Sequence, residues 1–286
     1  TPCHPYDPSD HGLFVAGIVH TVAPEAALTL VEVLNGQAVG TMQSIIDGFA
    51  KVMEALPGEK CPAVINCSFM LATPEAAYHA QTEDGDCQPE HARDTFDDWS
   101  TWVTDNPWQV ILPKRLLDWM SNLLTEVGVS FVAAAGNEGV KGTHPPARYP
   151  AASKSAVGVG AIQANGSSTP YSNLADSPLV DGFQALGGMR DAQTLRAIND
   201  PAAPERGILG IFTRPFPGAS PDDELPNQNG WGYWAGTSFA TPIVAGLLAR
   251  LRGCGKGHDV SIALLRKLPP YEQPDKPGQL KIKQGR

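Results

Sequence analysis

The sequence predicts an α/β fold around a mostly parallel β-sheet, and three observations support this prediction. Short apolar runs rich in β-branched residues recur along the chain. Longer stretches between them repeat apolar residues at helical spacing. No internal repeat is present, and 286 residues suit one large domain or two small ones. Strands that alternate with helices in this way are typical of a parallel sheet.

The individual elements follow from the same patterns. The expected strands are Ala27–Leu34, Ala63–Ser68, Val129–Ala135 and Ala156–Ile162. The expected helices are Thr41–Leu56, Leu116–Val127, Ser238–Leu251 and Ile262–Leu268. The last strand contains two glycines, Gly158 and Gly160, where neighbouring backbone is expected to approach closely.

Two stretches interrupt the alternation. Ala72–Pro113 is polar, acidic and contains tryptophan, and Asp176–Arg206 is rich in proline, aspartate and alanine. Both are expected to be surface loop insertions in one domain that spans residues 1–268. The Pro- and Lys-rich tail, residues 269–286, is expected to be an extended segment or linker. A partner-binding role for the acidic insertion stays open beside that of a solvated loop.

Composition excludes several classes of function. Lys and Arg total 21 against 30 Asp and Glu, a net charge of −9, so nucleic acid is not expected as the main partner. No apolar stretch reaches the roughly 18 residues that span a bilayer, so no membrane association is expected. Thr1–His11 has neither the basic start nor the apolar core of a signal peptide.

Cysteine usage bears on the compartment. The five cysteines are spread widely, and an odd number cannot all pair within one chain. This favours a reducing, cytoplasmic compartment over secretion. A Cys61–Cys87 bridge around the first insertion remains an alternative.

The first of three candidate catalytic segments is Asp10–Val19, DHGLFVAGIV. A histidine before a glycine and a run of small and apolar residues places the imidazole of His11 at the start of a buried helix. A lone histidine in such a place is more often a surface or capping residue, so this segment gains meaning only with the others.

The second segment is Val132–Gly139, VAAAGNEG. A strand of small residues stops abruptly at Gly136-Asn137, so the Asn137 carboxamide is expected to project from the strand end into a cleft. The alternative is an ordinary Gly-Asn turn, for which both residues are also favoured.

The third segment is Gly236–Pro242, GTSFATP, which opens an apolar helix. Serine is a preferred N-cap, so Ser238 has an ordinary structural interpretation. A hydroxyl at that place also lies where backbone N–H groups converge and the helix dipole favours negative charge. That setting suits a nucleophile whose attack creates an oxyanion.

Taken together, the three segments resemble the subtilisin-like serine proteases (subtilases), whose catalytic residues follow the order Asp, His, Ser. GTSFATP is a close match to the family's serine motif, and AAAGNEG is similar to its oxyanion-asparagine segment. HGLFVAGIV resembles HGTHVAG, with Leu13 and Phe14 in place of Thr and His. The resemblance covers most of residues 10–252 and implies a three-layer sandwich with a mostly parallel central sheet.

The resemblance also implies a mechanism and a site. Ser238 is expected to attack the peptide carbonyl, His11 to act as general base, and Asn137 to stabilise the oxyanion. Substrate is expected to lie as an added strand between two edge segments, above a small-residue pocket floor. The edges and the floor comprise Ala38, Val39, Gly40, Ser68, Phe69, Met70, Ala134, Ala135 and Gly136. No cofactor is expected for the chemistry. Structural calcium occurs in the family, but the sequence assigns no ligands.

One departure concerns specificity. The family usually has small residues, often Gly-Gly, where this chain has Met70 and Leu71. A narrowed or reshaped pocket is expected, which favours smaller or flexible apolar side chains. The alternative is that Met70 turns away and packs under the insertion.

The carboxylate of the triad is missing from its expected place. In the family it lies about thirty residues before the histidine, and ten residues precede His11. The favoured explanation is a separate N-terminal fragment that carries the aspartate. The others are a catalytically silent peptide-binding or scaffold protein, and substitution by Asp7 or Asp10, which are better interpreted as solvated loop or helix-start acids.

Other classes of site are weaker. Cys3, His4 and His11 match no usual zinc spacing and lack a fourth ligand. Gly158-Val159-Gly160 lacks the third glycine of a dinucleotide loop. An α/β-hydrolase needs Gly-x-Ser-x-Gly, but Ala240 stands two places after Ser238.

Overall fold

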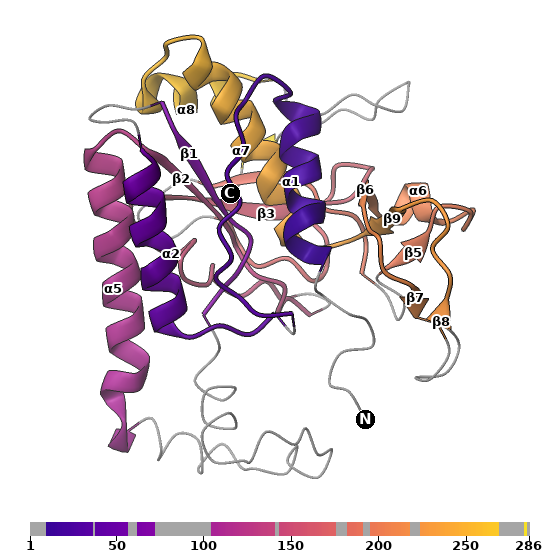
Figure 1. The fold of residues 1–286 in the computed structure, drawn as a ribbon, viewed down its shortest axis with the longest axis horizontal. Coiled ribbons are helices and arrows are strands. Elements are labelled where there is room, and N and C mark those ends of the chain that lie inside the picture. The colour runs from indigo at the N-terminus through magenta and orange to yellow at the C-terminus, as the bar shows by residue number, and fades with distance from the viewer. Residues whose placement is uncertain are drawn as a thin grey trace.

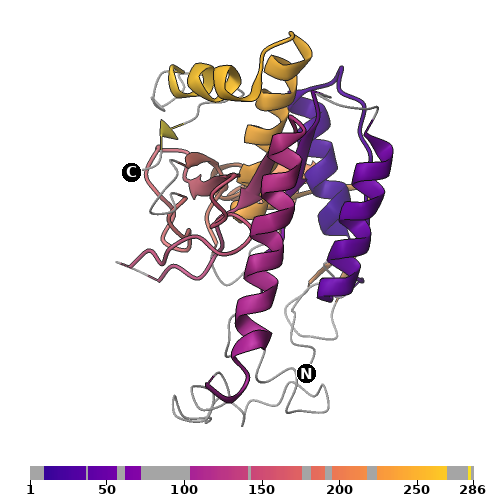
Figure 2. The ribbon, with the colours of Figure 1, turned by 90° about the vertical axis from the view of Figure 1, so that its left-hand side faces the viewer.

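The sheet lies between two groups of helices, which confirms the predicted three-layer α/β architecture (Figures 1 and 2). The structure is a computed structural model. It describes residues 10–36, 38–56, 62–71, 104–140, 143–175, 182–190, 195–217, 224–268 and 283–284.

The central sheet has the strand order β1-β2-β3-β4-β10. Its strands are β1 Val64–Cys67, β2 Ser130–Ala134, β3 Ala156–Ile162, β4 Phe183–Leu186 and β10 Lys283–Gln284. The first four are parallel, and β10 runs antiparallel to β4. The carboxyl ends of the parallel strands therefore meet at one edge, where the segments that carry Ser68 and Asn137 begin.

Helices cover both faces of this sheet. The principal ones are α1 His11–Val22, α2 Met42–Ala55, α5 Pro107–Glu126 and α7 Thr237–Gly253. The alternation of β2 divides the core: Phe131 and Ala133 pack with α2 and α5, whereas Val132 packs with α1 and α7. In Figure 1, α2 and α5 stand on one side of the sheet, and α1 and α7 on the other.

Helices α1 and α7 approach each other closely. A Cβ added at Gly246 of α7 would lie 2.8 Å from the Cβ of Val22 in α1, which is nearer than side chains allow. The glycine therefore permits close contact between α7 and the carboxyl-terminal end of α1, the helix whose first residue is His11.

Smaller elements lie beyond α1 in Figure 1. They are β5 Arg196–Ala197, α6 Ala203–Arg206, β6 Ile208–Ile211, β7 Phe216–Pro217, β8 Glu224–Leu225 and β9 Trp231–Trp234. An antiparallel sheet has the order β5-β9-β6, and β7 pairs with β8. The last helix, α8, is His258–Arg266. Strand β9 leads directly into α7 and so delivers Trp234 to the candidate site.

The prediction of a strand at Ala27–Leu34 is wrong. The segment is extended but pairs with no strand in the described part of the chain. It packs along α2 instead: the Ser44 hydroxyl donates to the Val33 carbonyl at 2.7 Å, and Gly48 leaves room for the Val33 side chain. An apolar alternating pattern indicates an extended backbone, but a strand also needs a neighbour.

Both expected insertions contain regular structure. Helix α5 begins at Pro107, inside the stretch expected to be a loop up to Pro113. Strand β4, Phe183–Leu186, is a buried strand of the central sheet inside the second stretch. The remaining predicted helices and strands were confirmed, with ends that differ by no more than four residues, apart from α5, which begins well before its predicted start at Leu116.

The close backbone approach predicted at the glycines of β3 is confirmed. A Cβ at Gly158 would meet the Ala175 carbonyl oxygen at 2.2 Å. Of the cysteines, Cys67 is buried and Cys254 exposed, both unpaired, and Cys3, Cys61 and Cys87 lie outside the described residues. None of the described helices is long and apolar enough to span a bilayer.

Candidate active site

His11 is the first residue of α1, as the sequence predicted. The preceding residue, Asp10, fixes where the helix begins. Its buried carboxylate accepts hydrogen bonds from the backbone N–H of Thr213 (2.5 Å), the Thr213 hydroxyl (2.8 Å) and the backbone N–H of Arg214 (3.1 Å). Asp10 is thus a buried anchor, which differs from the solvated or helix-capping acid expected from the sequence.

The imidazole of His11 lies among aromatic rings. Its centroid is 5.7 Å from the Trp234 ring, edge-on, and 5.4 Å from the Phe239 ring. Phe14, one of the departures from the family motif, is fully buried and packs on the same two rings. Burial against these apolar surfaces disfavours the imidazolium and lowers the pKa of His11 to about 4.

Asn137 follows the carboxyl end of β2, and its carboxamide is anchored by α7. The Asn137 Oδ1 accepts from the Thr237 backbone N–H (2.9 Å) and from the Thr237 hydroxyl (3.0 Å). With the oxygen held there, the Nδ2 group faces the opposite direction and its N–H bonds are left to donate elsewhere. The side chain is half-buried, so a ligand can reach it.

Ser238 is the second residue of α7 and is not its N-cap. The helix begins at Thr237, its N-cap is Gly236, and no side chain caps it. The Ser238 hydroxyl donates to the Ser68 carbonyl at 3.4 Å, and the Ser68 hydroxyl donates back to the Ser238 carbonyl at 2.8 Å. The capping interpretation of Ser238 is therefore wrong. Its half-buried hydroxyl lies at the positive end of the helix dipole without being used by the helix.

The three predicted residues converge on the first turn of α7. His11 contacts the ring of Phe239 and Asn137 binds Thr237, so each touches a residue adjacent to Ser238. No hydrogen bond joins His11 to Ser238 within the described residues. Catalytic hydrogen bonds are often long in proteins without substrate and tighten when it binds.

No carboxylate in the described part of the chain is hydrogen-bonded to His11. The Asp10 carboxylate bonds instead to Thr213 and Arg214. Asp7 lies outside the described residues. The structure thus places His11, Ser238 and Asn137 around the first turn of α7, and no carboxylate of the described residues is hydrogen-bonded to His11.

The first expected substrate edge, Ala38 to Gly40, is a tight turn. Asn35 N–H donates to the Val39 carbonyl (2.9 Å), Val39 N–H donates to Asn35 Oδ1 (3.0 Å), and Ala38 N–H donates to the Asn35 carbonyl (2.9 Å). Ala38 adopts a left-handed φ of 59° to close this turn. Gly40 is the position in this segment whose backbone groups make no turn hydrogen bond among the described residues.

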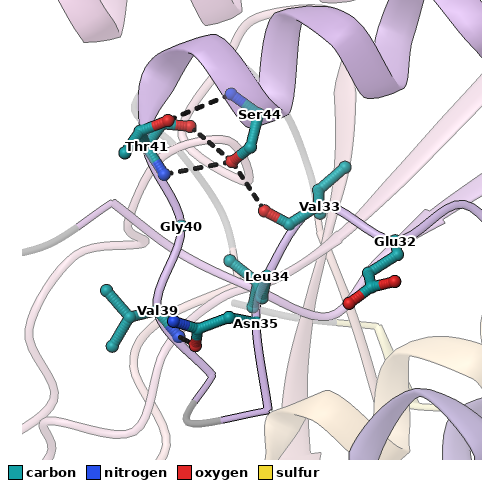
Figure 3. Close-up of a pocket in the computed structure, with 8 residues that line it drawn as sticks. All are labelled: Glu32, Val33, Leu34, Asn35, Val39, Gly40, Thr41 and Ser44. Carbon is teal, nitrogen blue, oxygen red and sulfur yellow. Dashed lines mark hydrogen bonds between the residues drawn. The ribbon is translucent and has the colours of Figure 1, made fainter.

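An open pocket of about 320 Å³ adjoins this turn (Figure 3). Its wall is lined by Glu32, Val33, Leu34, Asn35, Val39, Gly40, Thr41 and Ser44. Ser44 ties the wall together, since its hydroxyl donates to Val33 O and accepts from Thr41 N–H. Neither His11, Asn137 nor Ser238 lines this pocket, so it borders the expected substrate edge and not the reacting groups.

The second edge and the pocket floor lie at the carboxyl ends of β1 and β2. Ala134, Ala135 and Gly136 are buried and carry no side chain larger than a methyl group, as a pocket floor requires. Ser68 and Phe69 are half-buried, and Met70 is 42% exposed. The exposed Met70 is thus not packed beneath any described segment, and most of the insertion under which it was alternatively expected to pack, residues 72–103, lies outside the described residues.

The residues present offer no metal centre in the described regions. No three His, Cys, Asp or Glu side chains gather closely enough there to hold an ion. Cys3 and His4, weighed as zinc ligands, lie outside these regions. Calcium ligands are therefore not assigned.

Sequence reasoning missed the residues that support the site. Thr237 holds Asn137, and Trp234 and Phe239 enclose His11. Thr237 and Phe239 flank Ser238 in the sequence motif, so their place next to Ser238 could have marked them as residues of the site. Trp234 offered none, because its contact depends on how β9 enters α7.

The amino-acid sequence matches the subtilase family (peptidase S8) over residues 4–258, which is most of the chain. The chain belongs to the subtilase family. Family membership supports a serine protease, and the matched range contains His11, Asn137 and Ser238. No curated protein shows significant sequence similarity to this subtilase.

Solved structures of other proteases share the fold. A protease from Pseudoalteromonas arctica is 22% identical, with a TM-score of 0.58, over 94% of this subtilase and 66% of that chain. A lanthipeptide protease is 21% identical, with a TM-score of 0.57, and the match covers 95% of this subtilase and 71% of that chain. A cold-adapted subtilisin-like serine proteinase is 21% identical, with a TM-score of 0.53, and the match covers 96% of this subtilase and 73% of that chain. This subtilase thus spans about two thirds to three quarters of their lengths.

Proposed function

We propose that this subtilase is an endopeptidase that cleaves peptide bonds with Ser238 as nucleophile, His11 as general base and Asn137 as oxyanion donor. The observation that supports this most is the anchoring of Asn137 Oδ1 by both the N–H and the hydroxyl of Thr237. That anchor leaves the Asn137 N–H bonds to donate beside the residue that follows Thr237. A donor fixed in advance next to a nucleophile is the arrangement that stabilises an oxyanion.

The reaction proceeds in two halves. The Ser238 oxygen bonds to the carbonyl carbon while His11 takes the hydroxyl proton, and the carbonyl oxygen becomes an oxyanion that accepts from Asn137 Nδ2. His11 then gives its proton to the amide nitrogen as the C–N bond breaks, which releases the amine and leaves an acyl-serine. Water repeats the sequence and regenerates the Ser238 hydroxyl.

The acid of the triad is proposed to come from outside residues 1–286, from a polypeptide segment that packs beside His11. A triad acid holds the histidine in the correct tautomer and stabilises its protonated form. The lowered pKa of His11 is consistent with this need, because a neutral imidazole in an apolar setting is a weak base. A catalytically silent subtilase that binds peptides is the second candidate function, favoured by the same missing acid.

A fluorophosphonate probe tests the proposed function on the purified protein. We expect covalent labelling at Ser238, detected by peptide mass spectrometry, and no labelling of Ser238→Ala. Ser261→Ala is the matched control, since Ser261 is buried in α8 and donates to Gly257, and it should label like the unaltered protein. Intact mass spectrometry of the same sample shows whether a second polypeptide accompanies the chain. Absence of labelling with that polypeptide bound would favour the silent peptide-binding alternative.

Met70 is proposed to narrow the pocket for the side chain that precedes the cut. We expect a peptide library to be cleaved after small or flexible apolar residues in preference to Phe, Tyr or Trp. Met70→Gly should raise kcat/KM for bulky aromatic residues by about tenfold or more, the scale on which pocket volume discriminates. Met53→Gly offers a control at an exposed methionine of α2. Equal cleavage after aromatic residues by the unaltered protein would contradict the proposal.

A further inference from the structure

A buried asparagine, Asn173, is hydrogen-bonded to both neighbours of Asn137. Asn173 is 1% exposed. Its backbone N–H donates to the Gly136 carbonyl at 3.1 Å, and its Oδ1 accepts from the Glu138 N–H at 3.0 Å. The backbone on each side of Asn137 is therefore tied to one residue that lies 36 positions further along the chain.

The remaining polar group of Asn173 is also satisfied. Its Nδ2 donates to the Glu138 carboxylate at 2.6 Å and to the Pro146 carbonyl at 3.1 Å. The Oδ1 meets a donor and the Nδ2 meets two acceptors, so only a carboxamide fits this position without loss. The close fit depends on Gly136, where a Cβ would lie 2.7 Å from the Asn173 Nδ2.

We infer that Asn173 is a positioning residue that sets the direction of the Asn137 carboxamide, an inference that rests on the proposed oxyanion role of Asn137. Asn137 has two anchors: Thr237 holds its Oδ1, and Asn173 holds the backbone on both sides of it. Because the backbone and the Oδ1 of Asn137 are both held, rotation of its side chain is restricted and its Nδ2 points in one fixed direction. Oxyanion stabilisation depends on such pre-orientation, because donors displaced by about 1 Å lose most of their effect.

A double-mutant cycle separates positioning from general support of the fold. Asn173→Ala is expected to lower kcat about tenfold while KM changes by less than about twofold. In an Asn137→Ala background the same change should lower kcat by less than about twofold, because no amide remains to be aimed. Gln184→Ala is the matched control, since Gln184 is a buried amide of β4 that bonds to Ser168. It should leave kcat unaltered. Equal losses from Asn173→Ala in both backgrounds would overturn the inference.

A second test exchanges the hydrogen-bond donor and acceptor between the side chains of Asn173 and Glu138. It remains usable if Asn173→Ala fails to fold. Asn173→Asp places a carboxylate against that of Glu138, and kcat should fall at least as far as in Asn173→Ala. Adding Glu138→Gln restores a donor–acceptor pair in the reverse sense, and kcat should recover by about fivefold or more. Glu138→Gln alone keeps the acceptor and should have little effect. No recovery in the double variant contradicts the inference.

An NMR measurement does not depend on activity. The side-chain NH₂ signals of Asn137, identified by their loss in Asn137→Ala, are expected to shift or broaden in Asn173→Ala and to stay in place in Gln184→Ala. Unmoved signals in Asn173→Ala would overturn the inference. Failure of the fluorophosphonate probe to label Ser238 when the acid-bearing polypeptide is bound would refute the proposed function instead, and the two failures are thereby distinguished.

Discussion

The chain of residues 1–286 is expected to hydrolyse peptides about 10⁴-fold more slowly than a subtilase with a complete triad, because no carboxylate of the described residues is hydrogen-bonded to His11 and this is the usual cost of losing the acid. Asp10 cannot serve where it lies, since its carboxylate is committed to Thr213 and Arg214. The measurement is kcat per active site, with sites counted by fluorophosphonate labelling.

Reconstitution supplies the control for this expectation. Any polypeptide that accompanies the chain is separated in denaturant, and turnover is measured before and after recombination. Turnover should fall by about 10⁴ on separation and return on mixing. Asp7→Asn should change neither value. Full subtilase turnover by the lone chain would mean that an acid within these 286 residues already serves His11.

The pH dependence of kcat/KM tests independently whether a carboxylate lies beside His11. Because the pKa of His11 is about 4, kcat/KM of the lone chain should stay level down to about pH 5 and fall below it as the imidazole protonates. A carboxylate seated beside His11 favours the protonated form and should move this limb toward neutral pH. The ring signal of His11 in an NMR titration reports the midpoint directly.

The lowered pKa also bears on stability. Unfolded histidine titrates near 6.5, so the fold favours the neutral imidazole. The stability that follows is complete above about pH 6.5 and is lost as the pH falls through about 4. Denaturant unfolding at pH 7 and pH 4 should therefore show a larger loss than in His11→Phe, which has no charge to gain.

Replacing Asn137 by alanine is expected to lower kcat by about 10²–10³-fold, with KM little changed. That magnitude is carried over from the equivalent asparagine of a subtilisin, the family's own measured case. The physical reason is that the amide donates to the oxygen only when negative charge develops on it. Asn122→Ala is the control, since Asn122 is an exposed asparagine on α5. A loss below about twofold would remove Asn137 from the mechanism.

Local pattern predicted the elements whose boundaries are marked in the sequence. Strand β3 matches its predicted range, Ala156–Ile162, because polar residues bound its apolar run. Helix α2 was predicted to within one residue at each end from the helical spacing of its apolar residues, and in the structure Thr41 and Ser44 form a capping box at its start. The apolar stripe then fixes which face packs on the sheet.

The failures share a physical cause, which is that tertiary contacts decided the outcome. Ala27–Leu34 has the composition of a strand, but its place in the fold gives it a helix as neighbour. The four residues of β4 are too short to show a period, and Gln184 interrupts their apolar character. The polar, acidic composition of Ala72–Pro113 suggested a loop throughout, although Pro107 stands in the first turn of α5, where proline is well tolerated, and Pro113 lies inside the same helix.

For the site, the sequence identified the candidate catalytic residues but not the residues that support them. His11, Asn137 and Ser238 lie in motifs with recognisable neighbours. The partner of Asn137 is 100 positions away at Thr237, and Asn173 stands in no motif. Contacts of this range are set by strand order, which the sequence predicts only in outline.

The turn that contains Asn173 reaches the nucleophile as well as the amide. The Tyr171 carbonyl accepts a hydrogen bond from the Gly139 N–H, and the Tyr171 hydroxyl donates one to the Gly187 carbonyl. The Gly187 carbonyl also accepts from the N–H of Gly236, which lies two residues before Ser238. The backbone segments that carry Ser238 and Asn137 are therefore both hydrogen-bonded, directly or through Gly187, to the turn that contains Tyr171 and Asn173. When this turn moves in a thermal fluctuation, the Ser238 hydroxyl and the Asn137 carboxamide are expected to move with it, so the distance between them should vary less than the position of either group.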